Sequence, residues 1–111
     1  MNFSNLGEVV PTKIDIKLKG GAKKTHVLIQ GVYFLQSNHV NGKRYWLQSE
    51  GLHALWYVKG NWMIGNKAKL GKNFGRMHTK DSVGPLDASS WSYHNGVKWI
   101  ETNDLIILTG S

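Results

Sequence analysis

The stretch from residue 32 to residue 65 constrains the fold of this chain more than any other. It holds three of the five tryptophans and three of the four tyrosines. These fall in four apolar runs of strand length, at residues 33–35, 45–47, 54–58 and 62–64, and aromatic and β-branched residues favour strands. Asn41-Gly42 and residues 59–61 can each form a tight reversal. The stretch therefore predicts four consecutive antiparallel strands.

Further strands are predicted on both sides of this stretch. Residues 14–18 alternate apolar and charged side chains, as in a half-buried strand, and residues 27–29 begin another short one. Residues 66–72 predict a loop with one helical turn, and residues 74–78 a strand. Asn95-Gly96 predicts a hairpin between residues 91–93 and 97–100. Residues 105–108 are apolar throughout, which predicts a central or covered last strand.

The chain length and turn content indicate one all-β domain. With 111 residues, thirteen glycines and only two prolines, the chain has the size of a single core and many positions suited to turns. We predict an antiparallel meander that closes into a small barrel or compact sandwich of about seven or eight strands. Residues 1–12 are expected to be a lead-in segment and residues 13–111 the β domain.

Two segments far apart in the chain resemble each other. Residues 16–20 and 106–110 share a similar pattern, and Asp15 and Asp104 lie just before them. This echo suggests one unit of a tandem array followed by the first strand of the next unit. It predicts that the last strand takes a place like that of the first strand, closing the sheet within the same chain or completing a neighbouring copy. Closure within the chain is the preferred prediction.

An ordered set of aromatic and turn residues resembles a known kind of module. The set is Gly31-x-Tyr33, Asn41-Gly42-x-x-Tyr45, Leu55-Trp56-Tyr57, Trp62-x-Ile64-Gly65, Gly75, Pro85, Trp91 and Asn95-Gly96-x-x-Trp99. It is similar to an aromatic-rich module of about 90 residues that recurs, singly or in tandem, in large multi-unit proteins. The resemblance covers about residues 14–108 and implies a self-contained β module, without indicating a ligand.

Charge is unevenly distributed along the chain. The net charge is +7, with thirteen Lys or Arg against three Asp or Glu in residues 1–80, and one against four in the remainder. A basic surface can serve solubility or attract polyanions. The amino terminus lacks the features of a signal peptide, and no apolar stretch is long enough to cross a bilayer. We expect a soluble protein without membrane contact, in a compartment that the sequence does not indicate.

Chemistry-bearing motifs are sparse. The five histidines lie 13 to 25 residues apart, so none forms the close pair typical of a metal site. There is no cysteine and no Gly-x-Ser-x-Gly elbow. Glu50 with Asp81 or Asp87 is a conceivable acid/base pair, but their spacing does not distinguish them from solubilising charges. We therefore predict no metal, no cofactor and no catalytic residue, and favour a non-enzymatic protein.

The nine tryptophan and tyrosine residues indicate a binding function. Neighbours such as Tyr45 and Trp46 must point to opposite faces of a sheet, and a single sheet buries one face unless it curls or is covered. Some rings are then expected to be exposed, where they can stack on a sugar or a base. The predicted ligand-binding residues are Tyr45, Trp46, Trp56, Trp62, Trp91, Trp99, Asn41, His94 and Asn95.

These features predict a non-catalytic, lectin-like module that binds carbohydrate through exposed rings and nearby Asn and His side chains. A second hypothesis is a structural module that self-assembles into a homo-oligomer through its aromatic face and last strand. A third is single-stranded nucleic-acid binding through the basic segment 59–80.

Overall fold

The computed structural model describes residues 10–80, 84–88 and 90–109. They form one antiparallel sheet with a short helix, α1 (Gly20–His26), and three 3₁₀ turns, η2 (Val27–Ile29), η3 (Lys67–Lys69) and η4 (Pro85–Asp87). The strands are β1 (Lys13–Leu18), β2 (Gly31–Val40), β3 (Lys43–Gln48), β4 (His53–Val58), β5 (Asn61–Asn66), β6 (Met77–Thr79), β7 (Trp91–His94), β8 (Trp99–Thr102) and β9 (Leu105–Thr109).

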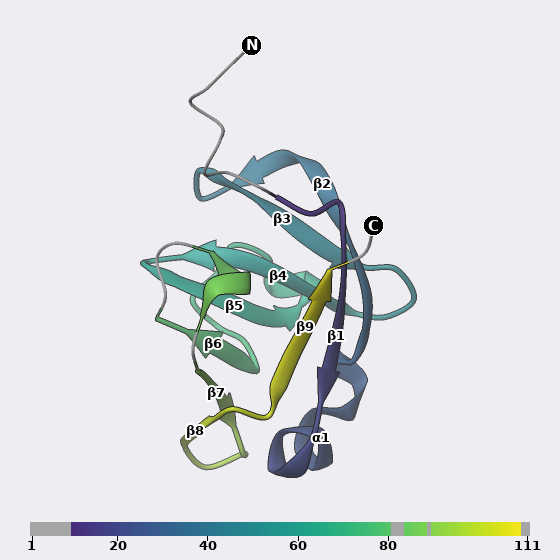
Figure 1. The fold of residues 1–111 in the computed structure, drawn as a ribbon. Coiled ribbons are helices and arrows are strands. Elements are labelled where there is room, and N and C mark those ends of the chain that lie inside the picture. Colours follow the sequence, from purple (N-terminus) through teal and green to yellow (C-terminus); the bar gives the residue numbers. More distant parts are fainter. Residues whose placement is uncertain (1–9, 81–83, 89, 110–111) are drawn as a thin grey trace.

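The sheet is a meander that curls into a half-barrel. Its order is β8-β7-β6-β5-β4-β3-β2-β1-β9, so every strand from β1 to β8 lies beside its neighbour in sequence. β9 is the exception, because it returns to pair antiparallel with β1, placing Ile16 opposite Ile107. Figure 1 shows β9, in yellow, beside β1, in purple. The all-β antiparallel fold is thus confirmed, and so is the pairing of the last strand with the first within one chain.

The aromatic stretch folds as its pattern predicts. The four predicted strands are β2 to β5, and the reversals between them contain Asn41 and Lys59 in left-handed conformations, with φ of 54° and 48°. The Asn95-Gly96 hairpin is also confirmed, with Gly96 at φ 102°, although β8 begins at Trp99 and not at residue 97. The predicted helical turn after β5 is η3.

One sequence prediction is wrong, and the prediction of a central or covered last strand holds only in its second form. Residues 27–29 form the 3₁₀ turn η2 and not a strand, and they follow a helix, α1, that the sequence did not indicate. Of the seven helical residues, only Ala22 is buried, so no apolar periodicity marks the helix. β9 is not central, since it ends the sheet order. It is partly covered, because Leu105 and Ile107 pack against the core.

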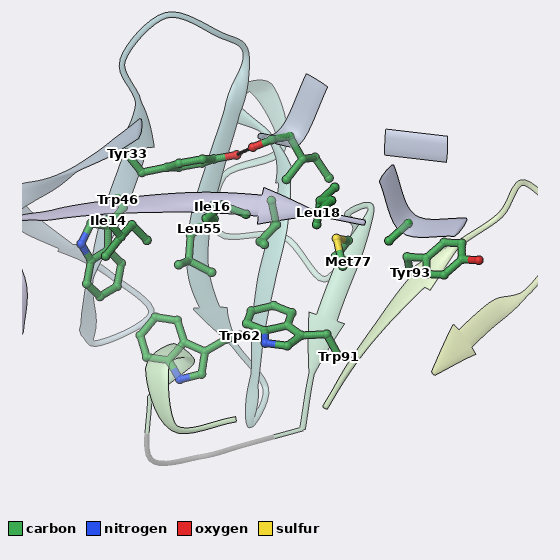
Figure 2. Close-up of a cluster of buried hydrophobic side chains, with 13 residues drawn as sticks. Ile14, Ile16, Leu18, Tyr33, Trp46, Leu55, Trp62, Met77, Trp91 and Tyr93 are labelled. Carbon is green, nitrogen blue, oxygen red and sulfur yellow. Dashed lines mark hydrogen bonds between the residues drawn. The ribbon is translucent and has the colours of Figure 1, made fainter. Parts of the chain in front are cut away.

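The concave face of the sheet holds the main core, which we call the inner core. Almost every strand contributes to it, and Figure 2 shows the side chains converging. Trp46 and Trp62 meet edge to face, with ring centroids 6.0 Å apart. Tyr33 is fully buried, and its hydroxyl donates to the carbonyl of Ile29 at 2.6 Å, the dashed line in Figure 2. This bond ties η2 to the core.

A second core covers the opposite face of β3 to β5. Buried Tyr45, Trp56 and Met63 are among its members, and Leu70, just after η3, packs against it. The segment from η3 to β6 therefore forms a second layer, which covers the convex face of this part of the sheet. As a result, adjacent rings such as Tyr45 and Trp46 are both buried, on opposite faces.

A buried amide joins η2 to the middle of the sheet. Gln48 is 4% exposed, and its Nε2 donates to the carbonyls of Leu28 and Gln30 at 3.0 and 2.9 Å. Its Oε1 accepts from the backbone N–H of His53 at 3.0 Å. A buried amide with all these partners fixes the position of the turn relative to β3 and β4.

Candidate ligand-binding site

Most of the rings predicted to bind ligand lie in the two cores. Trp46, Trp62 and Trp91 belong to the inner core, and Tyr45 and Trp56 to the second core, with exposed fractions between 0 and 6%. Two of these indole N–H groups also donate hydrogen bonds to backbone carbonyls of the same chain. Trp46 Nε1 donates to the carbonyl of Pro11 at 2.9 Å, and Trp56 Nε1 to that of Lys72 at 3.0 Å. In this structure, these rings offer no face to a ligand.

The two predicted turn amides bond to the backbone. The Asn41 amide donates to the carbonyls of Tyr57 and Gly71, at 2.8 and 2.9 Å. Asn95 Oδ1 accepts from the N–H groups of Val97 and Lys98, both at 2.8 Å. Asn95 therefore stabilises its own reversal, which is the ordinary use of Asn in turns, whereas Asn41 links the β2–β3 reversal to β4 and to the segment after η3.

Two of the predicted residues, Trp99 and His94, do come together on the surface. They face each other across the β7–β8 pair and line a pocket of about 560 Å³ on the convex side of the sheet. We call it the Trp99 pocket. Its lining residues are Asn61, Met63, Asn73, Phe74, Gly75, Arg76, His78, His94, Gly96 and Trp99. Small-molecule sites commonly have volumes of roughly 300–1,000 Å³, so the size suits a sugar or a similar ring.

Strand alternation places the polar residues of this pocket. The side chains of Met77 and Thr79, in β6, are buried on the concave face. Because side chains alternate along the chain here, Arg76 and His78 point to the convex face. In β7, Trp91 and Tyr93 are buried and His94 faces outward. The backbone N–H of His94 donates to the Arg76 carbonyl at 2.9 Å, which sets these two outward residues side by side.

The Trp99 ring is packed between the imidazoles of His78 and His94. It meets His78 edge to face with centroids 4.3 Å apart, and His94 in the same way at 5.2 Å. The ring remains 41% exposed. Aromatic contacts of this geometry restrict the rotamer, so the exposed part of the indole is oriented before any ligand arrives.

The opposite wall of the pocket depends on two glycines in close contact. A Cβ on Gly75 would come within 2.6 Å of the Met63 Sδ and 2.8 Å of the Ile64 carbonyl. A Cβ on Gly65 would come within 2.9 Å of the Gly75 Cα. Because neither glycine carries a side chain, the segment before β6 lies directly on β5, and this contact positions Phe74 and Arg76 at the pocket.

The pocket is basic and contains one imidazole, that of His78, with a lowered pKa. None of its ten described lining residues is acidic. Burial lowers the pKa of His78, and the nearby Lys80 ammonium lowers it further. Outside the pocket lining, burial followed by the charge of Arg76 lowers the pKa of His53. His26 also has a lowered pKa, chiefly from burial, although its bond to the His94 carbonyl acts in the opposite direction.

These lowered pKa values predict a loss of stability in acid. A histidine whose pKa is lower in the folded chain than its ordinary 6.5 binds fewer protons when folded. Its stabilising contribution is complete above pH 6.5 and decreases as the pH falls from 6.5 through the folded-state pKa. We expect thermal melts to give a lower Tm at pH 5 than at pH 7.5. His53→Gln should reduce this loss, whereas replacing the exposed His39 should not. A Tm that stays constant or rises across this range would contradict the prediction.

Several pocket residues were not anticipated as ligand contacts. His78 lies in β6, and Arg76 directly precedes that strand. Asn73 and Phe74 lie in the loop before it. The register of the Asn95-Gly96 hairpin was a usable signal for His94 opposite Trp99, because it is local. The pairing of β6 with β5 and β7, which brings in Arg76 and His78, has no comparable local signal.

The described residues offer little for metal or acid/base chemistry. No group of three His, Asp or Glu among them is arranged to hold a metal ion. Glu50 lies exposed in the turn after β3, whereas Asp81 and the side chain of Asp87 lie outside the described residues, so the conceivable acid/base pair stays untested. Within the described ranges, no helix is long and apolar enough to cross a membrane.

Comparisons with protein-family models, curated proteins and solved structures find no match to this chain. The resemblance to a recurring aromatic-rich module therefore stays a prediction.

Proposed function

We propose that this protein is a non-catalytic binding module and that the Trp99 pocket binds carbohydrate. The observation that carries the proposal is the Trp99 ring, which is 41% exposed and packs against two imidazoles. The rest of the pocket around this ring presents amides, imidazoles and a guanidinium. The apolar face of a sugar ring can stack on an indole while its hydroxyls bond to polar groups around the rim.

The polar groups of the pocket suit hydroxyl recognition. Asn61 and Asn73 can both donate and accept hydrogen bonds, as hydroxyl groups require. His94 Nδ1 accepts from the Gly96 N–H at 3.1 Å, so the neutral ring carries its proton on Nε2 and can donate there. Phe74, 58% exposed, adds a second aromatic surface.

Tryptophan fluorescence tests this proposal together with a glycan array. A bound oligosaccharide should shift the emission, and Trp99→Ala should weaken binding by about tenfold or more while leaving the Tm within a few degrees, since a stacked ring contributes roughly 1–3 kcal/mol. Phe34→Ala is the matched control, because Phe34 is 45% exposed on β2, outside the pocket lining. An array without any bound glycan, or unchanged binding by Trp99→Ala, would refute the proposal.

A structural role through self-assembly is the second candidate. β8 and β9 end the sheet order, so among the described strands each has one edge without a ladder partner. Such edges can pair with another copy of the chain. Light scattering at increasing protein concentration distinguishes the two candidates. A monomer throughout favours the binding module, whereas a defined oligomer that Trp99→Ala leaves intact favours assembly through the strand edges.

A further inference from the structure

We infer that the carbohydrate is anionic, bearing a carboxylate or a sulfate, and that Arg76 pairs with this group. The inference rests on the proposed function, because it assigns a charge to the ligand of the same pocket. Arg76 is held in place by its backbone, whose N–H donates to the Ile64 carbonyl at 2.7 Å and whose carbonyl accepts from His94 at 2.9 Å. The guanidinium thus projects from a strand-like position fixed between β5 and β7.

The charges around Arg76 leave it without compensation inside the pocket. The described lining contains no Asp or Glu. Glu101 lies on the same outer face, but it is not part of the lining and accepts from the Ser90 hydroxyl at 3.4 Å. Among the described residues, the charged side chains that act on the neighbouring histidines are positive, namely Lys80 on His78, and Arg76 on His26 and His53. The field in this region therefore favours an anion over a neutral ligand.

The geometry of the donors also suits an oxyanion. A guanidinium offers paired N–H groups that match the two oxygens of a carboxylate or sulfate. His94 contributes an Nε2–H from the adjacent strand. His78 Nδ1 is buried without a partner in the structure, and the ring that carries it stands against Trp99. A sugar stacked on Trp99 would place an acidic substituent within reach of this side of the pocket.

Matched pairs of ligands distinguish the contribution of the acidic group to affinity from that of the sugar rings. The first pair is a tetrasaccharide of galacturonic acid and its methyl ester, which keeps the rings and removes the charge. The second is a sulfated galactose tetrasaccharide and its desulfated form. We expect at least one acidic member to bind on the order of tenfold more tightly than its neutral counterpart, measured by tryptophan fluorescence in ~50 mM salt. The pair that shows the difference identifies the acidic group.

Arg76→Gln should remove this preference while the neutral sugar still binds. Lys98→Gln makes the same change of charge on the exposed β7–β8 hairpin and should retain the preference. Arg76→Lys should recover part of it, because a point charge remains without the paired donors. The ligand comparison on the unaltered protein stands even if Arg76→Gln is poorly folded.

The outcomes are distinguishable. Equal affinity for acidic and neutral members overturns the inference about charge and leaves the carbohydrate proposal in place. No binding of any saccharide overturns both. Tighter binding of a single-stranded DNA oligonucleotide, lost in Trp99→Ala and Arg76→Gln, would assign the pocket to nucleic acid instead. An acidic preference that persists in Arg76→Gln would show that another cation carries the recognition.

Discussion

Replacing Trp56 by alanine is expected to lower the free energy of unfolding by about 3–5 kcal/mol, the usual range for a buried aromatic ring. Trp56 is fully buried in the second core, and its ring lies so close to Gly65 that a Cβ there would come within 2.8 Å of it. The substitution also leaves the Lys72 carbonyl without its indole donor. Urea denaturation followed by circular dichroism measures this loss.

Trp56→Phe provides a graded control. It keeps an aromatic ring in the core but removes the indole N–H, and a net hydrogen bond contributes roughly 0.5–1.5 kcal/mol. Its loss should therefore be a fraction of that caused by alanine. Trp99→Ala should cost least of the three, since that ring is 41% exposed. If Trp56→Ala instead kept its stability and lost ligand binding, Trp56 would be the binding residue that the sequence pattern suggested.

Removing residues 103–111 is expected to cost about 3 kcal/mol or more, or to prevent folding. Each fully buried Leu or Ile contributes roughly 1.5–3 kcal/mol, and Leu105 and Ile107 each pack partly buried against the inner core. The truncation also strips β1 of its partner along the whole of β9, from Leu18 opposite Leu105 to Ile14 opposite Thr109. The exposed edge of β1 would then favour aggregation.

Point substitutions in β9 distinguish the contribution of its buried side chains to stability from that of the remaining C-terminal residues. Ile107→Asp places a carboxylate against the inner core and should strongly destabilise the domain, whereas Thr109→Asp, at an exposed position of the same strand, should have little effect. Thermal melts and light scattering report stability and association together. A truncated chain with an unchanged Tm and oligomeric state would show that β9 is dispensable. The side chains of Ile106 and Leu108 lie outside the described residues, so the expectation depends on Leu105, Ile107 and the backbone pairing.

The sequence by itself determined the strands of the aromatic stretch and the pairing of the last strand with the first, whereas the sheet of the described residues stays open between β8 and β9. Alternation and turn chemistry are local properties, so Asn41-Gly42 and Asn95-Gly96 predicted their hairpins. The echo around residues 16–20 and 106–110 predicted that the two segments occupy related places, and they pair with each other. Helix α1 escaped prediction because a single buried alanine leaves no periodic signal.

Only the tertiary structure decided which aromatic rings are exposed. A strand pattern shows that Tyr45 and Trp46 face opposite ways, but it does not show whether another layer covers the second face. Here the segment around Leu70 covers it, through the contact that Gly65 and Gly75 permit, and so the tyrosine and tryptophan of β3 and the tryptophans of β4 and β5 are all buried. The pocket likewise requires β6 to lie between β5 and β7, which brings Arg76 beside His94 and Trp99. Such pairings join residues distant in sequence, and their free energy depends on contacts that no local window contains.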